Sequence, residues 1–166
     1  MIDITNLSTI NVAISNYIAV VTMNNPPVNA QNRQFHDDLT LAFDVLSDWN
    51  DVRSIVLTGA GKCFSAGADI KGRVSQKSDL GDHWGHSRRV RECFYSIMEC
   101  RKPVIAAING AALGAGLAVA ASADILIASE SASIGLPEIN VGLLGGGRHA
   151  MRLFGHSKTR RLMLTG

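Results

Sequence analysis

Residues 61–72 read GKCFSAGADIKG and follow a short apolar run, SIVLTG, at residues 54–59. The run is typical of a buried strand over Ser54–Leu57. The stretch after it leaves two interpretations open. Either Ser65 is a nucleophile, or its side chain is incidental and the backbone around Ala66 carries the function. The two interpretations belong to unrelated classes of enzyme.

A serine nucleophile on a strand-to-helix turn requires the pattern G-x-S-x-G, and CFSAG at residues 63–67 supplies only the second glycine. A catalytic triad also needs an acid and a histidine. Asp124 with His149 or His156 are available for these roles, but no spacing supports them. A serine hydrolase that uses Ser65 is therefore kept as a minor alternative.

Alternating strand and helix patterns on both sides of this stretch predict an α/β fold with a sheet covered on both faces. The polar stretch Arg73–His86 has no clear period and is expected to be a mobile loop. We expect a strand pair over Val12–Met23 with a turn near Asn16, helices over Gln34–Trp49, Ser87–Cys100 and Leu113–Ser122, and strands over Val104–Ile108 and Asp124–Ala128.

The composition fits one globular domain, since the chain has 166 residues of which 46% are hydrophobic. A formal net charge of +2 does not argue for nucleic acid. Basic residues nevertheless cluster in two places, and each cluster is either a solvated helix face or a contact to an anionic ligand. The clusters are Arg88, Arg89 and Arg91, and Arg148, Arg152, Lys158, Arg160 and Arg161.

The N-terminal segment lacks the basic region and long apolar core of a signal peptide, and we expect no membrane association. Cys63, Cys93 and Cys100 are odd in number and form no CxxC pair. Neither a disulfide framework nor a zinc site is expected from them. These features predict a reducing compartment and a cytoplasmic location.

Two further patterns are weaker than they first look. Gly114-Ala115-Gly116 resembles part of a dinucleotide-binding loop, but the fingerprint requires a further glycine where Val119 stands. His83 and His86 in HWGH lack a third ligand at suitable spacing, so no metal site is expected.

A third pattern joins residues far apart in the sequence. A loop amide near Ala66 and a helix-start amide near Ala115 can converge on one developing oxyanion, because the first N–H groups of a helix have no partner within it. Glu138 lies in the apolar segment IGLPEINVG. It is either a salt-bridged structural residue or a carboxyl group poised for proton transfer, and the residues alone leave both open.

CFSAGADIKG, followed by KPVIAAINGAALGAGLAVAASADILIASESASIGLPEINVGLLGGGRHAMRLFG, resembles the crotonase superfamily, the enoyl-CoA hydratase/isomerase group. The turn NNPPVNA is similar to an early turn that contacts coenzyme A in that family. The resemblance implies a crotonase-like ββα spiral core and an acyl-CoA substrate. Coenzyme A would be part of the substrate, with no separate cofactor. By the same resemblance, the backbone N–H groups of Ala66 and Ala115 bind the thioester oxygen, and the substrate-binding residues are Ala30, Gly67, Ala68, Asp69 and Ile70.

One departure from the family concerns its two glutamates. Ala118 stands at the first glutamate position, and only Glu138 remains at the second. The resemblance therefore implies enolate chemistry with a single glutamate acid/base, in an enoyl-CoA hydratase or isomerase. The alternative is a non-catalytic binding or scaffold protein that keeps the fold.

A second departure concerns length. Family members usually continue into a C-terminal helical region that caps the site and builds trimers or hexamers. We expect residues 1–166 to form the spiral core, with that region absent from this chain. A homotrimer or hexamer is expected where the region is present.

Overall fold

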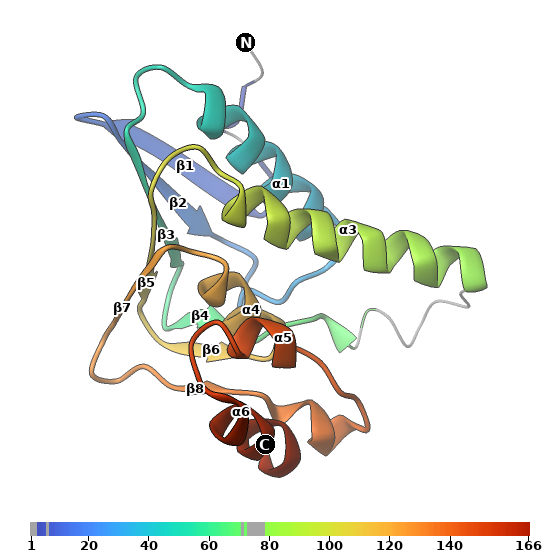
Figure 1. Ribbon diagram of the computed structural model, residues 1–166. Coiled ribbons are helices and arrows are strands. Elements are labelled where there is room, and N and C mark those ends of the chain that lie inside the picture. Colours follow the sequence, from blue (N-terminus) through green and yellow to red (C-terminus); the bar gives the residue numbers. More distant parts are fainter. Residues whose placement is uncertain (1–2, 6, 71, 73–78) are drawn as a thin grey trace.

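The computed structural model describes residues 3–5, 7–70, 72 and 79–166, which form two sheets with helices around them (Figure 1). The large sheet has the order β1-β2-β3-β5-β7, with strands β1 Ile10–Ser15, β2 Ile18–Met23, β3 Ser54–Gly59, β5 Val104–Ile108 and β7 Ile125–Ala128. The small sheet has the order β4-β6-β8, with strands β4 Cys63–Ser65, β6 Ala111–Leu113 and β8 Ile134–Gly135.

The chain alternates between the two sheets in a regular way. A strand of the large sheet leads into a strand of the small sheet three times in succession, as β3 to β4, β5 to β6 and β7 to β8, and a helical segment follows. All strand pairs in these three turns are parallel. This winding is the expected ββα spiral.

The predicted hairpin opens the fold. β1 and β2 pair antiparallel, with Ser15 opposite Ile18 at the turn. Asn16 and Tyr17 have φ values of 50° and 64°. Two consecutive residues with positive φ match the right-handed twist of a two-residue hairpin turn, and asparagine tolerates that conformation well. The strand pair over Val12–Met23 is therefore confirmed.

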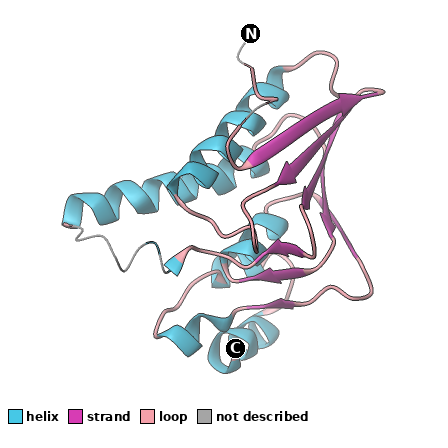
Figure 2. Cartoon of the chain, turned by 180° about the vertical axis from the view of Figure 1, so that it is seen from behind, coloured by secondary structure: helices cyan, strands magenta, loops and turns pink. Residues whose placement is uncertain are grey.

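Two long helices cover the large sheet (Figures 1 and 2). α1, Arg33–Asp48, begins where the Asn32 side chain accepts a hydrogen bond from the N–H of Phe35, as predicted to within one residue at each end. α3, Leu80–Met98, begins seven residues before the predicted start at Ser87. A reciprocal capping box between Asp79 and Asp82 starts it there.

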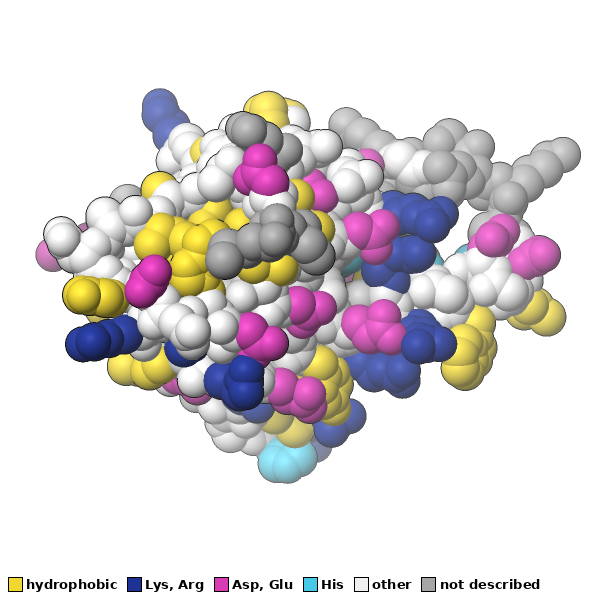
Figure 3. All heavy atoms as spheres, turned by 90° about the horizontal axis from the view of Figure 1, so that it is seen from above, with side chains coloured by type: hydrophobic (Ala, Val, Ile, Leu, Met, Phe, Trp, Pro, Cys, Tyr) yellow, Lys and Arg dark blue, Asp and Glu magenta, His cyan; other side chains and the backbone are white. Residues whose placement is uncertain are grey.

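The earlier start of α3 corrects part of the predicted loop over Arg73–His86. Residues 80–86 are helical. They show no apolar period because this first part of the helix is mostly exposed. Residues 73–78 lie outside the described residues. Figure 3 shows the face seen from above, where Lys and Arg side chains are interspersed with acidic ones, as on a solvated surface.

The remaining helical segments belong to the second half of the chain. They are α4 Ala115–Ala121, the 3-10 helix η1 Pro137–Val141, α5 Gly147–Ala150 and α6 His156–Thr165. α4 is buried from Gly116 onward, as its small residues predict. Among the described residues, no helix is long and apolar enough to span a membrane.

Candidate active site

The three strands of the small sheet bring three distant segments to one edge. Residues 66–70 follow β4, residues 114–118 follow β6, and Pro137 and Glu138 follow β8. Because the strands run parallel, their carboxyl ends meet at the same edge, where ligands of open parallel sheets bind. All three segments line one cavity of about 570 Å³.

Glycines allow the first two segments to touch through their main chains. Gly67 has a φ of 91°, and a Cβ atom there would lie 2.6 Å from the carbonyl oxygen of Leu113 and 3.1 Å from the nitrogen of Ala115. Gly114 has a φ of 55°, and a Cβ atom there would lie 2.7 Å from Oε1 of Glu138. A side chain at either position would therefore separate the segments that form the cavity.

Some backbone N–H groups of these segments donate a hydrogen bond within the described part of the protein, and others do not. The N–H of Ala66 donates to the carbonyl oxygen of Val28 at 3.0 Å, so it is not available to a thioester oxygen, contrary to the sequence-based expectation. The N–H groups of Ala68 and Ala115 have no acceptor among the described residues, and both residues line the cavity. The loop thus offers a free donor two residues after the expected one.

Glu138 is the carboxyl group of the cavity. Its Oε2 atom is buried and has no hydrogen-bond partner within the described part of the chain. Burial raises the pKa of this carboxyl above its ordinary value. No cation of the described residues forms a salt bridge with it. Of the two interpretations of Glu138, the structure therefore favours the carboxyl poised for proton transfer.

Ala118 lines the same cavity from α4 and is 2% exposed. The position carries a methyl group on the cavity wall, so α4 contributes no carboxylate there. Among the described residues that line the cavity, the carboxyl group is that of Glu138.

The predicted substrate-binding residues divide into two groups. Gly67, Ala68 and Ile70 line the cavity. Asp69 and Ala30 are not among its lining residues. The Asp69 side chain accepts a hydrogen bond from the N–H of Gly72 at 3.0 Å, and the Ala30 carbonyl oxygen accepts one from a side-chain amide in the neighbouring turn at 2.6 Å.

Ser65 has no role as a nucleophile in this geometry. Its side chain is fully buried, and its hydroxyl donates to the carbonyl oxygen of Asn29 at 2.8 Å. Asp124, the candidate acid, instead accepts a hydrogen bond from the N–H of Val104 at 2.8 Å. The serine-hydrolase alternative is therefore wrong, because the hydroxyl holds the loop to the preceding turn.

Three histidines that sequence reasoning did not assign to the cavity line it, namely His36, His86 and His149. The ring of His149 packs edge-on against Phe94 with 4.6 Å between centroids. Burial, with Arg152 and Arg148 nearby, lowers the pKa of His149. For His149 the available signal is the glycine run just before it, since Gly145 and Gly146 line the same cavity. Within the described ranges, no group of three or more metal-binding side chains could hold an ion.

Comparisons with known proteins agree with this geometry. Residues 13–166 match the model of the family described as enoyl-CoA hydratase/isomerase. The chain is 40% identical over 147 residues to a Bacillus subtilis protein named probable enoyl-CoA hydratase, covering 89% of this chain and 57% of that protein. It is 36% identical over 148 residues to a Mycobacterium tuberculosis protein, named as the hydrolase of a methyl-dioxo-hexahydroindene-carboxyl-CoA, covering 89% of this chain and 60% of that protein.

Solved structures give the same result. DspI from Pseudomonas aeruginosa superposes with a TM-score of 0.86 at 35% identity, covering 95% of this chain and 65% of that one. A protein from Magnetospirillum magneticum, described as an enoyl-CoA hydratase/carnithine racemase, superposes with a TM-score of 0.90 at 27% identity, covering 96% and 61%. The chain spans between half and two thirds of the length of the relatives named here. By its sequence and its crotonase fold, this chain belongs to the enoyl-CoA hydratase/isomerase family.

Proposed function

We propose that the protein carrying this chain is an enzyme that acts on acyl-CoA thioesters through a stabilised enolate, as an enoyl-CoA hydratase or isomerase. The observation that carries the proposal is the convergence on a single cavity of two N–H groups without an acceptor among the described residues and one carboxyl group with a buried oxygen. Family membership supports the thioester as the substrate class. Coenzyme A belongs to the substrate, and no separate cofactor is proposed.

The N–H groups of Ala68 and Ala115 are proposed to hold the thioester oxygen. Both are free of acceptors among the described residues, and Gly67 brings the loop within contact of the Ala115 nitrogen. Amide donors fixed in place before the reaction stabilise the negative charge that develops on the oxygen, and removal of one such donor costs about a hundredfold or more in rate. Ala68 therefore takes the place in this mechanism that the sequence had suggested for Ala66.

Glu138 is proposed to move the proton at the substrate carbon or to activate water. A carboxyl group with a raised pKa exchanges protons more readily near neutral pH than an exposed one does. Because Ala118 supplies no second carboxylate, one group serves as both acid and base.

We also propose that the protein is a homo-oligomer, a trimer or a hexamer. Large apolar side chains on β7, η1, α6 and the loops beside them support contacts with further protein surface, and among them Ile127, Leu144 and Leu164 are 61%, 72% and 61% exposed. The three cysteines are unpaired, which is consistent with the proposed cytoplasmic location.

A second candidate is a binding protein without catalysis, which Ala118 favours because it removes one of the two carboxylates of the hydration mechanism. Exchange of α-protons separates the two candidates. The protein is incubated in heavy water with saturated and unsaturated acyl-CoA thioesters, and product masses and deuterium positions are recorded.

We expect deuterium incorporation that falls about a hundredfold or more in Glu138→Gln. Added water or a moved double bond distinguishes hydratase from isomerase. Glu130→Gln is the matched control, since Glu130 is exposed and lies outside the cavity. A folded protein that binds thioesters but exchanges no protons would be the binding protein instead.

A further inference from the structure

A second cavity, of about 470 Å³, adjoins the first. Ser87, Val90, Phe94 and His149 line both cavities. None of residues 66–70 lines the second one. The second cavity is therefore reached from the first by passing Phe94 and His149, away from the loop that carries the Ala68 donor.

Two elements form the walls of this second cavity. One wall is a single face of α3, whose lining residues recur at helical spacing: Ser87, Val90, Arg91, Phe94, Tyr95 and Met98, with Glu99 after them. The other wall comes from α5 and the turn after it, through Arg148, His149 and Arg152. Val90 and Phe94 supply apolar side chains to the passage between the cavities, beside Ser87 and His149.

The charges on these walls are mainly positive. Arg91, Arg148 and Arg152 line the cavity against one carboxylate, Glu99. None of the three guanidinium groups forms a salt bridge with any of the described residues. The Nε of Arg152 donates to the carbonyl oxygen of Ala121 at 2.7 Å, which holds that side chain at the cavity wall.

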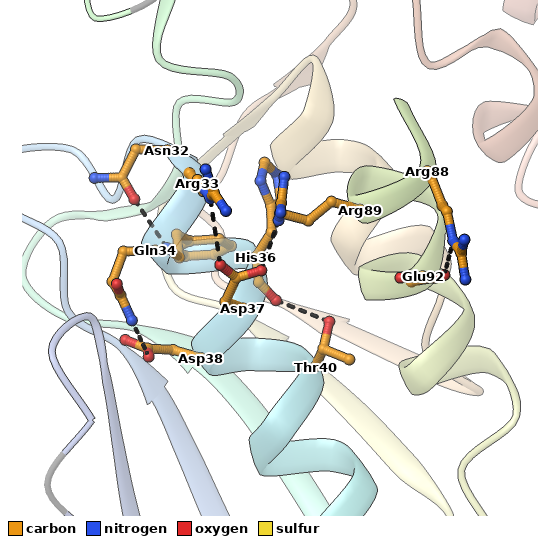
Figure 4. A network of polar contacts seen from close by, with 11 residues as sticks. Asn32, Arg33, Gln34, His36, Asp37, Asp38, Thr40, Arg88, Arg89 and Glu92 are labelled. Atoms are coloured by element: carbon orange, nitrogen blue, oxygen red, sulfur yellow. Dashed lines mark hydrogen bonds and ion pairs between the residues drawn. The ribbon is translucent and has the colours of Figure 1, made fainter. Parts of the chain in front are cut away.

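Other arginines of α3 behave differently. Arg88 bonds Glu92 at 2.7 Å, and Arg89 bonds Asp37 of α1 at 2.7 Å (Figure 4). These two arginines lie outside the second cavity. Among the arginines of α3 in the described part of the chain, the one without a carboxylate partner, Arg91, is thus the one that lines the cavity, together with Arg148 and Arg152. This contrast within α3 favours an anionic ligand over a solvated face.

We propose that this second cavity binds a carboxylate at the far end of the acyl chain, so that the substrate class is an acyl-CoA whose chain ends in a carboxylate. The inference rests on the proposed function, in which the thioester occupies the first cavity. The methylene chain would pass Val90 and Phe94, and the terminal carboxylate would meet Arg91 and Arg148. Arginine suits this role because its planar group donates two parallel hydrogen bonds to a carboxylate.

Binding of unreactive CoA thioethers tests the inference without any turnover. Titration calorimetry measures the dissociation constants of two thioethers of equal chain length, one ending in a carboxylate and the other in a methyl group. The comparison is repeated over a series of chain lengths. We expect the carboxylate-ended member to bind more tightly at one or more lengths. Arg91→Gln and Arg148→Gln should each weaken it by about threefold to tenfold, since the arginines are partly solvated. Methyl-ended analogues and free coenzyme A should be unaffected.

Arg88→Gln is the matched control, because it removes an equal charge from the same helix outside the cavity. Equal weakening of all thioethers and of free coenzyme A would assign the arginines to the coenzyme phosphates and overturn the inference. No preference for the carboxylate at any length, or no thioether binding at all, would overturn it too. Tight binding of the methyl-ended thioethers without proton exchange on the corresponding thioesters would count against the proposed function alone.

Nuclear magnetic resonance of His149 gives a second test that needs no variant. Burial lowers the pKa of His149, and Arg152 and Arg148 lower it further, while Arg91 and Glu99 line the same cavity. A bound carboxylate would offset the arginine charges, so the pKa of His149 should rise with the carboxylate-ended thioether and not with the methyl-ended one. Equal behaviour with both ligands would contradict the proposed position of the carboxylate.

Discussion

The two walls of the first cavity are built on different principles. Where the loop after β4 meets α4, main chain packs on main chain, and a Cβ atom on Gly116 would collide with the carbonyl oxygen of Ser65. The wall between η1 and α5 is more open, because its close contacts are with side chains: a Cβ atom on Gly146 would lie 2.6 Å from a methyl carbon of Leu136, and one on Gly142 would meet nothing within 4 Å. The positions of the amide donors are therefore fixed by packing of main chain on main chain, whereas the position of the Glu138 carboxyl group depends on a side chain.

Gly116→Ala tests the tight wall and should have the largest effect. The collision is with backbone, which cannot rotate away, so we expect a loss of about 3 kcal/mol or more in the free energy of unfolding. Urea denaturation measures it. Gly85→Ala is the control, because Gly85 is exposed in α3 with nothing within 4 Å of a Cβ atom, and alanine there should stabilise by about 0.5–1 kcal/mol. Similar small effects for both variants would contradict the contrast between the walls.

Gly142→Ala tests the open wall. Gly142 ends η1 with a φ of 71°, so alanine there meets strain from its backbone conformation but no collision. We expect a cost of about 1 kcal/mol in unfolding free energy, from the left-handed conformation alone. A cost as large as that of Gly116→Ala would show that the two walls are equally rigid.

The smallest expected effect is a pH dependence of stability that comes from Glu138. Burial raises its pKa in the folded state above the ordinary value of 4.5, so the folded state binds the proton more tightly than the unfolded state does. This group therefore favours folding most at low pH, and its contribution falls as the pH rises from 4.5 through the raised pKa. Because Glu138 is only half-buried, the change should be modest.

The measurement is a set of unfolding curves across that pH range for the native chain and for Glu138→Gln. The difference between the two curves isolates the carboxyl group. A difference that stays constant with pH would mean that burial does not perturb Glu138.

Much of the fold followed from apolar periodicity. The hairpin, α1 and the strands β3 and β5 were predictable, because their buried residues recur at the spacing of a strand or a helix. β7 was predictable from its run of β-branched and apolar residues, although its side chains are mostly exposed. The short strands β6 and β8 were not, since three and two residues are too few to show a period. The first residues of α3 were missed for a related reason, because that part of the helix is exposed and only the Asp79–Asp82 capping box indicates it.

The sequence was enough to predict which segments form the site, but not which backbone N–H group of the loop lies at the cavity. Sequence motifs located the loop, the helix and Glu138, yet they suggested Ala66 as the loop donor. Which backbone N–H faces the cavity depends on pairing with the turn before α1: the N–H of Ala66 bonds Val28, and that of Asp69 bonds Gln31. The N–H of Ala68 lies between these two bonds and has no acceptor in the part of the chain that the structure describes. Such partners are not readable from residue types.

The free N–H groups of Ala68 and Ala115 also bear on how this protein can change by mutation. Every residue except proline carries a backbone N–H, so most codon changes at either position keep the donor as long as the backbone path is kept. A codon change at Glu138, by contrast, removes the carboxyl group at once. Under the proposed function, a single codon change can therefore remove the acid–base group and leave both amide donors of the cavity in place.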